Sequence, residues 1–433
     1  MSPLFGPILA QLVTLAVSDR TEARYIATNA GGSHAEAATA PRVGLDFGWK
    51  HTELSQSTLS LGYGPTFTAT PILETKTPEL FVFQAASLGA SHSERWERTT
   101  FTIGEQLSYT LTNPRLAALS GGGAFPQTFT MAGSQTGMPS GNSTGTPTGN
   151  PSGVPNGTGN AMAGTGTAGN LTPAQTDRNV QLFTETTTAR VEQFISARLK
   201  LGGELGYLMT GAVRESDRSS YPLVRGPRGQ LFAAYRATRH DTLTSSVSSQ
   251  YASLSMGNTA WVNVANEAWS HQFDARTSST LAGGVSASRS SQPDGLVAWS
   301  IYPVFNANIG HVSRLGRGSL VLGLSASSAP ALDPIQGSVD PRLTLGALAA
   351  LGQDRFSMAL TVASAVALTT TDGQSAFNSI NSSLSAGYQL GAGFSVDSGV
   401  RALWQKFGGD TTIPASLVAF VGVTFGDSFA LNH

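Results

Sequence analysis

The stretch KLGGELGYLM, Lys200 to Met209, decides how the rest of the chain is interpreted. Leu201 and Leu205 share one parity of an extended chain, whereas Lys200 and Glu204 share the other. Because successive side chains of a strand point to opposite faces, this segment predicts a strand with one apolar face and one charged face. The fold depends on which of the two faces lies inside.

The same alternation recurs from Val43 to Phe425. Representative segments are VGLDFGWK (43–50), TLSLGYG (58–64), TFTIGEQLSYTL (100–111), LVAWSIYPVF (296–305), NSSLSAGYQL (381–390) and FSVDSGVRALW (394–404). About 17 such segments can be counted, and a weaker one at Ala23–Thr28 brings the number to 18, with 16 as the alternative. A period of two over so many segments predicts an all-β protein.

The connections between the segments also alternate in length. Short turns occur around Arg198, Arg239, Arg276, Arg314, Arg355 and Gly391. Longer polar stretches lie between them, including RESDRSSYPLVRGPRG, SSQPDG, SAPALDPIQGSVD, TTTDGQSA and GGDTTIP. A chain that winds up and down between two different environments has this asymmetry.

The composition excludes several classes of protein. Charged residues make up 12% of the chain, against about 25% in ordinary soluble proteins. The net charge is −1 and the basic residues are dispersed, so no nucleic-acid partner is expected. The absence of cysteine excludes disulfides, thiolate metal sites and cysteine nucleophiles.

Two segments depart from the alternating pattern. Residues 1–18 are almost uncharged and end in Ala16-Val17-Ser18, which is typical of a secretory signal peptide, although no basic residue precedes Arg20. Residues 120–178 are rich in Gly, Ser, Thr, Pro and Asn, and we expect them to form a disordered external loop. The remaining sequence, 19–433, is expected to form a single domain.

Closing the predicted sheet on itself explains these features together. Strands cross a bilayer only as a closed barrel, whose outer face meets lipid and whose wide lumen holds water. In such a barrel Leu201 and Leu205 point to lipid, while Lys200 and Glu204 point inward. A soluble sandwich or propeller is the alternative, but the polar face is rich in Ser, Thr, Gly and Asn and not in the Lys and Glu that protect edge strands.

On this alternation and turn asymmetry, the chain resembles the bacterial outer-membrane β-barrel proteins, the porin-like class in the broad sense. The resemblance implies an antiparallel barrel in the outer membrane, surrounded by lipid and inserted by the barrel-assembly machinery. Such barrels usually end on an aromatic residue, whereas here Phe425 is followed by GDSFALNH, in which Phe429 is a displaced counterpart.

The chain carries no local motif for catalysis or metal binding. The seven histidines lie at positions 34, 51, 92, 240, 271, 311 and 433, and no two have the spacing of a metal-binding motif. His240 beside Asp241 is interpreted as turn chemistry. We therefore expect neither an enzyme nor a cofactor, although a Ser/His or Asp/His pair assembled from distant strands stays open at this stage.

The lumen is the remaining candidate for a functional site. Parity assigns to it seven charged residues, namely Asp46, Lys50, Lys200, Glu204, Arg236, Asp397 and Arg401. Both signs are present, which predicts a mixed field and no strong selection by charge. The leading hypothesis is a pore for small polar solutes or an export conduit. A plugged barrel that anchors loop 120–178 at the cell surface, and a partner in exopolysaccharide export, are the alternatives.

Overall fold

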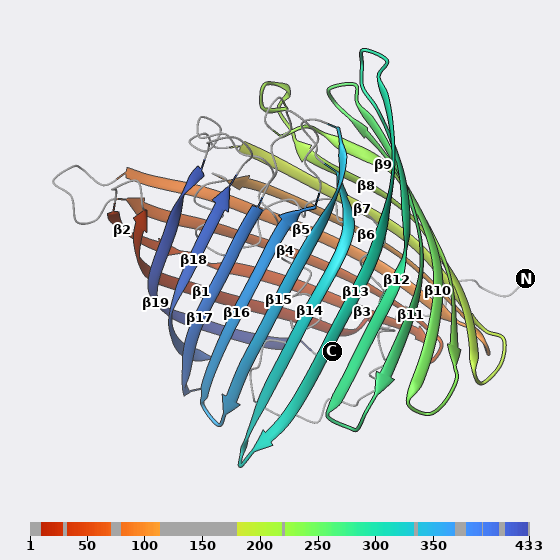
Figure 1. Ribbon diagram of the computed structural model, residues 1–433. Coiled ribbons are helices and arrows are strands. Elements are labelled where there is room, and N and C mark those ends of the chain that lie inside the picture. Colours follow the sequence, from red (N-terminus) through yellow and green to blue (C-terminus); the bar gives the residue numbers. More distant parts are fainter. Residues whose placement is uncertain are drawn as a thin grey trace, which may run out of the picture.

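The computed structural model describes residues 10–28, 33–70, 79–112, 180–218, 221–332, 337–368, 378–391, 393–406 and 412–431. Figure 1 shows that they form one antiparallel β-barrel. Among these residues, none of the helical structure is long and apolar enough to cross a membrane.

The barrel is built from strands that follow one another in chain order. Their bounds are β1 Ala10–Thr28, β2 Ser33–Thr39, β3 Arg42–Thr52, β4 Ser55–Thr70, β5 Glu79–Arg95, β6 Thr99–Thr112, β7 Val180–Phe194, β8 Leu199–Ala212, β9 Val224–Arg236, β10 Asp241–Leu254, β11 Thr259–Gln272, β12 Thr277–Ser291, β13 Val297–Leu315, β14 Gly318–Leu332, β15 Val339–Gln353, β16 Phe356–Ala367, β17 Asn378–Gly391, β18 Phe394–Lys406 and β19 Thr412–Leu431. A 3₁₀ turn at Glu215–Asp217 lies between β8 and β9.

The barrel closes between its first and last strands. Residues 13–28 of β1 pair with residues 416–431 of β19, and from β3 to β19 each strand pairs with the next strand in sequence. On the other side of β1, the short strand β2 and the strand β3 occupy one position, separated only at Ala40 and Pro41. The 19 described strands therefore make 18 positions around the barrel, which confirms the predicted fold class and strand number.

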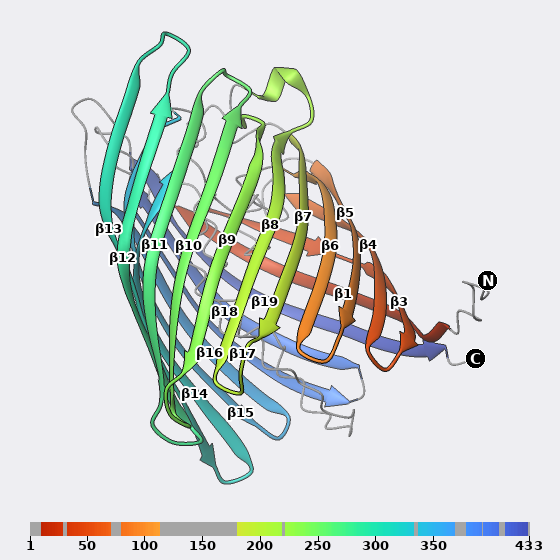
Figure 2. The same cartoon turned by 90° about the vertical axis from the view of Figure 1, so that its right-hand side faces the viewer.

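Most connections at one end of the barrel are short turns and most at the other are longer, as predicted, but β1–β2 and β10–β11 at the long-loop end also span only four residues each. Short turns join β3 to β4, β7 to β8, β9 to β10, β11 to β12, β13 to β14 and β15 to β16 at one end. In the β11–β12 turn, Asp274 accepts hydrogen bonds from the backbone N–H groups of Arg276 and Thr277 at 2.6 and 2.7 Å. The first of these bonds is the main reason that the pKa of the Asp274 carboxyl is lowered. Both described ends of the chain lie near this end of the barrel (Figure 2).

The outer face of the barrel is apolar. Leu205, Leu231 and Ile301 expose 71%, 70% and 75% of their surface. Such exposure is costly in water, and each of these residues shares its face with further exposed Leu, Val, Trp or Phe side chains on the neighbouring strands. This face is therefore the lipid-contacting surface of a transmembrane barrel. In the segment Lys200–Met209, the apolar face with Leu201 and Leu205 therefore lies on the outside of the barrel.

One hairpin leaves the wall at the long-loop end. The pairing of β14 with β13 stops at Ser328, and the pairing of β15 with β16 stops at Arg342. Beyond these points the two strands form a ladder only with each other, and Pro330 lies opposite Pro341, whose carbonyl accepts one hydrogen bond from the Leu368 N–H at 3.0 Å. Proline lacks an N–H donor and is therefore tolerated where a strand has lost its outer partner. We call the segments 329–332 and 339–341 the tongue.

The tongue packs against the inner wall. Leu332 and Val339 continue the parity of the lipid-facing Leu324 and Leu345, yet they are 2% and 4% exposed. They belong to a buried apolar cluster with Val262, Val264 and other residues on the inner face of β9–β13. The hairpin end must therefore bend into the barrel. This corrects the expectation that SAPALDPIQGSVD is only a polar loop.

Two expected segments are placed differently. The predicted signal peptide, residues 1–18, overlaps β1, in which residues 10–18 pair with residues 42–49 of β3. A cleavable leader stays a prediction, and cleavage after Ser18 would remove these pairs. The predicted disordered loop, residues 120–178, lies outside the described residues.

Candidate functional site

The inner face of β7, β8 and β9 carries a chain of alternating charges. Lys200 Nζ lies 3.4 Å from Glu192 Oε2, and Glu192 also accepts a hydrogen bond from Arg190 Nε at 2.9 Å. Arg190 Nη1 lies 3.7 Å from Glu204 Oε2, and Arg228 Nη2 lies 3.6 Å from the other oxygen of Glu204. We call these five residues the β7–β9 ladder.

Strand register brings the ladder together from three segments of the chain. Arg190 is directly opposite Glu204 on β8, and Glu204 is opposite Gln230 on β9, two residues from Arg228. Side chains at directly opposite and diagonal positions of an antiparallel pair are within reach of each other. Lys200 lies next to the short β7–β8 turn, so the ladder runs from that rim toward the middle of the barrel.

An aromatic ring lies within the ladder. Phe232 on β9 is opposite Gly202, and a Cβ atom at Gly202 would lie 2.2 Å from the ring atom Cζ. The ring therefore covers the backbone of β8 at the glycine. The Arg190 guanidinium carbon and Lys200 Nζ lie 5.3 and 5.5 Å from the ring centroid, which is within the range of cation–π attraction.

A second group of charges lies on β1, β18 and β19, and β10–β17 separate the two groups on one side of the barrel. Arg20 Nη2 lies 2.6 Å from Asp397 Oδ2 and 3.1 Å from Glu22 Oε2, and Glu22 also pairs with Arg24. The Arg401 guanidinium carbon lies 4.3 Å from the ring centroid of Phe420. We call this group the closure cluster because it lies where the barrel closes.

The structure places the sequence-predicted site residues at four locations. Lys200 and Glu204 belong to the β7–β9 ladder, and Asp397 and Arg401 belong to the closure cluster. The other three do not join either group through a described ion pair. Asp46 and Lys50 lie on the face of β3 opposite to the exposed Val43, and Arg236 ends β9 beside the short turn. That these seven residues line a conducting path stays a prediction.

Sequence reasoning missed several members of both groups, namely Arg190, Glu192, Arg228, Phe232, Arg20, Glu22, Arg24 and Phe420. A signal for two of them was present in TTTARVEQF, where Thr188, Arg190 and Glu192 share one parity. Phe232 gave no such signal, because an aromatic residue on the polar parity looks like an irregularity until the glycine opposite it is known.

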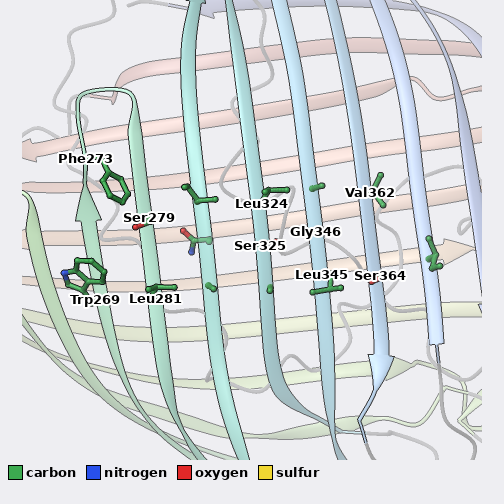
Figure 3. A pocket seen from close by; sticks show the side chains of 16 residues that line it. Trp269, Phe273, Ser279, Leu281, Leu324, Ser325, Leu345, Gly346, Val362 and Ser364 are labelled. Atoms are coloured by element: carbon green, nitrogen blue, oxygen red, sulfur yellow. The ribbon is translucent and has the colours of Figure 1, made fainter.

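An apolar hollow of about 810 Å³ lies on the outer wall (Figure 3). Its large side chains, such as Trp269, Leu281, Leu324 and Leu345, belong to the lipid-facing set. The hollow is therefore a contact surface for acyl chains of the membrane and is separate from the charged inner wall.

An Asp/His pair does occur, but between different residues from those adjacent in the sequence. Asp241 Oδ1 lies 2.7 Å from His271 Nδ1 and accepts a hydrogen bond from Trp269 Nε1 at 3.0 Å. His271 also packs edge-on against Phe273. Trp269 is on the lipid-facing side near the short-turn end, so the pair belongs to the aromatic girdle at the membrane interface.

Comparison with solved structures finds bacterial proteins of low similarity to this chain. Pseudomonas aeruginosa OccK7 (OpdD) has 12% sequence identity and a TM-score of 0.44, with 97% of this chain and 99% of that chain covered. Acinetobacter baumannii OccAB3 has 10% identity and a TM-score of 0.44, with 96% and 99% covered. At such low similarity, no residue role or solute is carried over. No curated protein sequence matches the chain.

The model of the EpsX exopolysaccharide export family matches residues 137–428, which include β7–β18 and β19 up to residue 428. With the closed barrel and its apolar outer face, this match agrees with the expected channel of the bacterial outer membrane. The chain belongs to the EpsX exopolysaccharide export family.

Proposed function

We propose that the barrel is the conduit through which an exopolysaccharide crosses the outer membrane. The observation that carries the proposal is the family match on a chain whose strands close into a barrel of 18 positions. A barrel of this size encloses a lumen wide enough for water and for a hydrated polysaccharide chain. The proposal includes no catalytic step and no cofactor.

The inner wall supports this proposal over strongly charge-selective transport. The β7–β9 ladder and the closure cluster both combine cations with carboxylates. A ring of one sign would select ions of the opposite charge, whereas paired charges present donors and acceptors together. Such a wall is suited to a hydroxyl-rich solute. A pore for small polar solutes is the second candidate, favoured by the same wall.

The test is a clean deletion of the gene in the native bacterium, with extracellular polysaccharide measured as the readout. We expect the deletion strain to lose extracellular polysaccharide and to regain it with the full chain supplied in trans. A deletion strain that secretes normal amounts overturns the export proposal and leaves the small-solute pore.

A version lacking residues 120–178, supplied to the same strain, distinguishes an export conduit from a plugged barrel that anchors this segment at the cell surface. A conduit retains export without that segment, because the described wall strands all lie outside it. Loss of export together with a correctly folded barrel would instead assign the function to the segment.

A further inference from the structure

The β7–β9 ladder differs from the closure cluster in its access to the lumen. Side chains of the ladder expose 42% at Arg190, 26% at Glu204 and 29% at Arg228. In the closure cluster, Arg20 and Asp397 expose 40% and 21%, whereas Glu22 and Arg24 expose only 4% and 8% and Phe420 is 4% exposed. The part of the closure cluster around Glu22, Arg24 and Phe420 is therefore packed into the wall, whereas all five ladder side chains and the ring of Phe232 are partly exposed.

Stability does not explain the ladder. Ion pairs between partly exposed side chains contribute little to folding, because water screens them and the long side chains lose conformational freedom. The ladder nevertheless holds three cations and two carboxylates in an alternating order across three strands. This partly exposed arrangement offers charged hydrogen-bond donors and acceptors beside an aromatic ring to a polar ligand in the lumen.

The charge balance indicates the class of ligand. Each cation of the ladder lies beside a carboxylate, so a polyanion would have to displace Glu192 and Glu204 from their partners. A neutral sugar needs no such displacement, since its hydroxyl groups donate to carboxylates and accept from guanidinium groups at the same time. The partly exposed ring of Phe232 offers an apolar surface for the C–H face of a sugar ring.

We propose that the β7–β9 ladder with Phe232 is a binding site for uncharged, hydroxyl-rich sugar units. The inference rests on the proposed function, because it names the substrate class of the same lumen. Lys200 lies beside the short β7–β8 turn, so the site begins at the periplasmic end of the lumen.

The experiment uses the purified full chain in planar bilayers, with block of the ionic current as the readout. Maltohexaose is the neutral probe, and an oligogalacturonate of the same length is the anionic probe. We expect maltohexaose to block the current longer than the anionic probe does. Phe232→Leu should shorten the maltohexaose block roughly tenfold. Phe420→Leu is the matched control, because Phe420 is buried in the closure cluster, and it should leave the block unchanged.

Glu204→Gln tests the charge balance independently. The substitution removes the carboxylate shared by Arg190 and Arg228, so it should lengthen the block by oligogalacturonate and shorten the block by maltohexaose. Heat-modifiable migration on a gel verifies that each variant is folded.

If oligogalacturonate blocks the unmodified protein for as long as maltohexaose does, or longer, the proposal that the ligand is an uncharged sugar is overturned. A maltohexaose block that is independent of Phe232, or no block at all, would overturn the site. Neither result touches the export proposal, because secretion by the complemented deletion strain is measured separately.

Discussion

Gly202 leaves the space on β8 that the ring of Phe232 fills. A Cβ atom at Gly202 would lie 2.2 Å from Cζ and 2.5 Å from Cε1 of that ring. We therefore expect Gly202→Ala to displace Phe232 and to lower the free energy of unfolding by about 1–3 kcal/mol, as overpacking usually does.

Gly283→Ala is the matched control for Gly202→Ala, because a Cβ atom at Gly283 would meet nothing within 4 Å. The control should stay within about 0.5 kcal/mol of the unmodified protein. The measurement is the free energy of unfolding of the detergent- or lipid-embedded barrel in denaturant. Equal values for the two variants would contradict the contact between Phe232 and β8.

The residues of the β7–β9 ladder show what the alternation of side chains along a strand can predict and what it cannot. Alternation alone assigned Lys200 and Glu204 to one face, because parity is a local property of a strand. It did not identify Arg190 or Arg228 as their partners, because partners across strands depend on register, and register is set by turn lengths and by the whole closed sheet. Phe232 is an aromatic residue on the polar face of β9, and it is explained only by Gly202 on β8, which leaves space for its ring.

Among the elements, the tongue is the one that parity interpreted wrongly. Leu332 and Val339 have the parity of lipid-facing residues, but the hairpin leaves the wall after Ser328 and Arg342, so that face turns to the inner wall. The prolines at 330 and 341 were visible in the sequence. Their effect was not predictable, because it depends on where the neighbouring strands stop pairing.

The tongue gives a prediction on pore size. Leu332→Asn places a polar group in the buried cluster, which costs about 1–3 kcal/mol when the group has no hydrogen-bond partner. Because the tongue strands form a ladder only with each other and a single backbone bond joins Pro341 to Leu368, we expect the hairpin end to detach from the inner wall while the barrel stays closed.

Single-channel conductance should then rise in Leu332→Asn. Ala331→Asn, on the opposite face of the same strand and only half-buried, should conduct like the unmodified protein. If both variants keep the original conductance with an intact barrel, the tongue does not narrow the mouth.

For the whole molecule, the strand number was predictable because each transmembrane strand repeats the same pattern between connections of alternating length. The 17 positions from β3 to β19 correspond to the 17 clear segments of the sequence, and β1 supplies the eighteenth. The extent of β1 was not predictable. Its first part, residues 10–18, has a composition typical of a leader, whereas in the barrel it pairs with β3 and β19.

Closure of the barrel depends on that first part of β1. Residues 10–18 pair with residues 42–49 of β3, and residues 13–18 pair with residues 426–431 of β19. Without them, backbone groups on both neighbours would face hydrocarbon, at a cost of several kcal/mol for each unsatisfied group. We therefore expect a chain that lacks residues 1–18 to fail to form a heat-modifiable barrel, and a chain that lacks only residues 1–9 to form one. Both are compared after refolding from urea into detergent, so that no targeting step intervenes. A heat-modifiable barrel from the chain without residues 1–18 would show that residues 19–28, paired with β2 and β19, close the sheet without the pairs to β3.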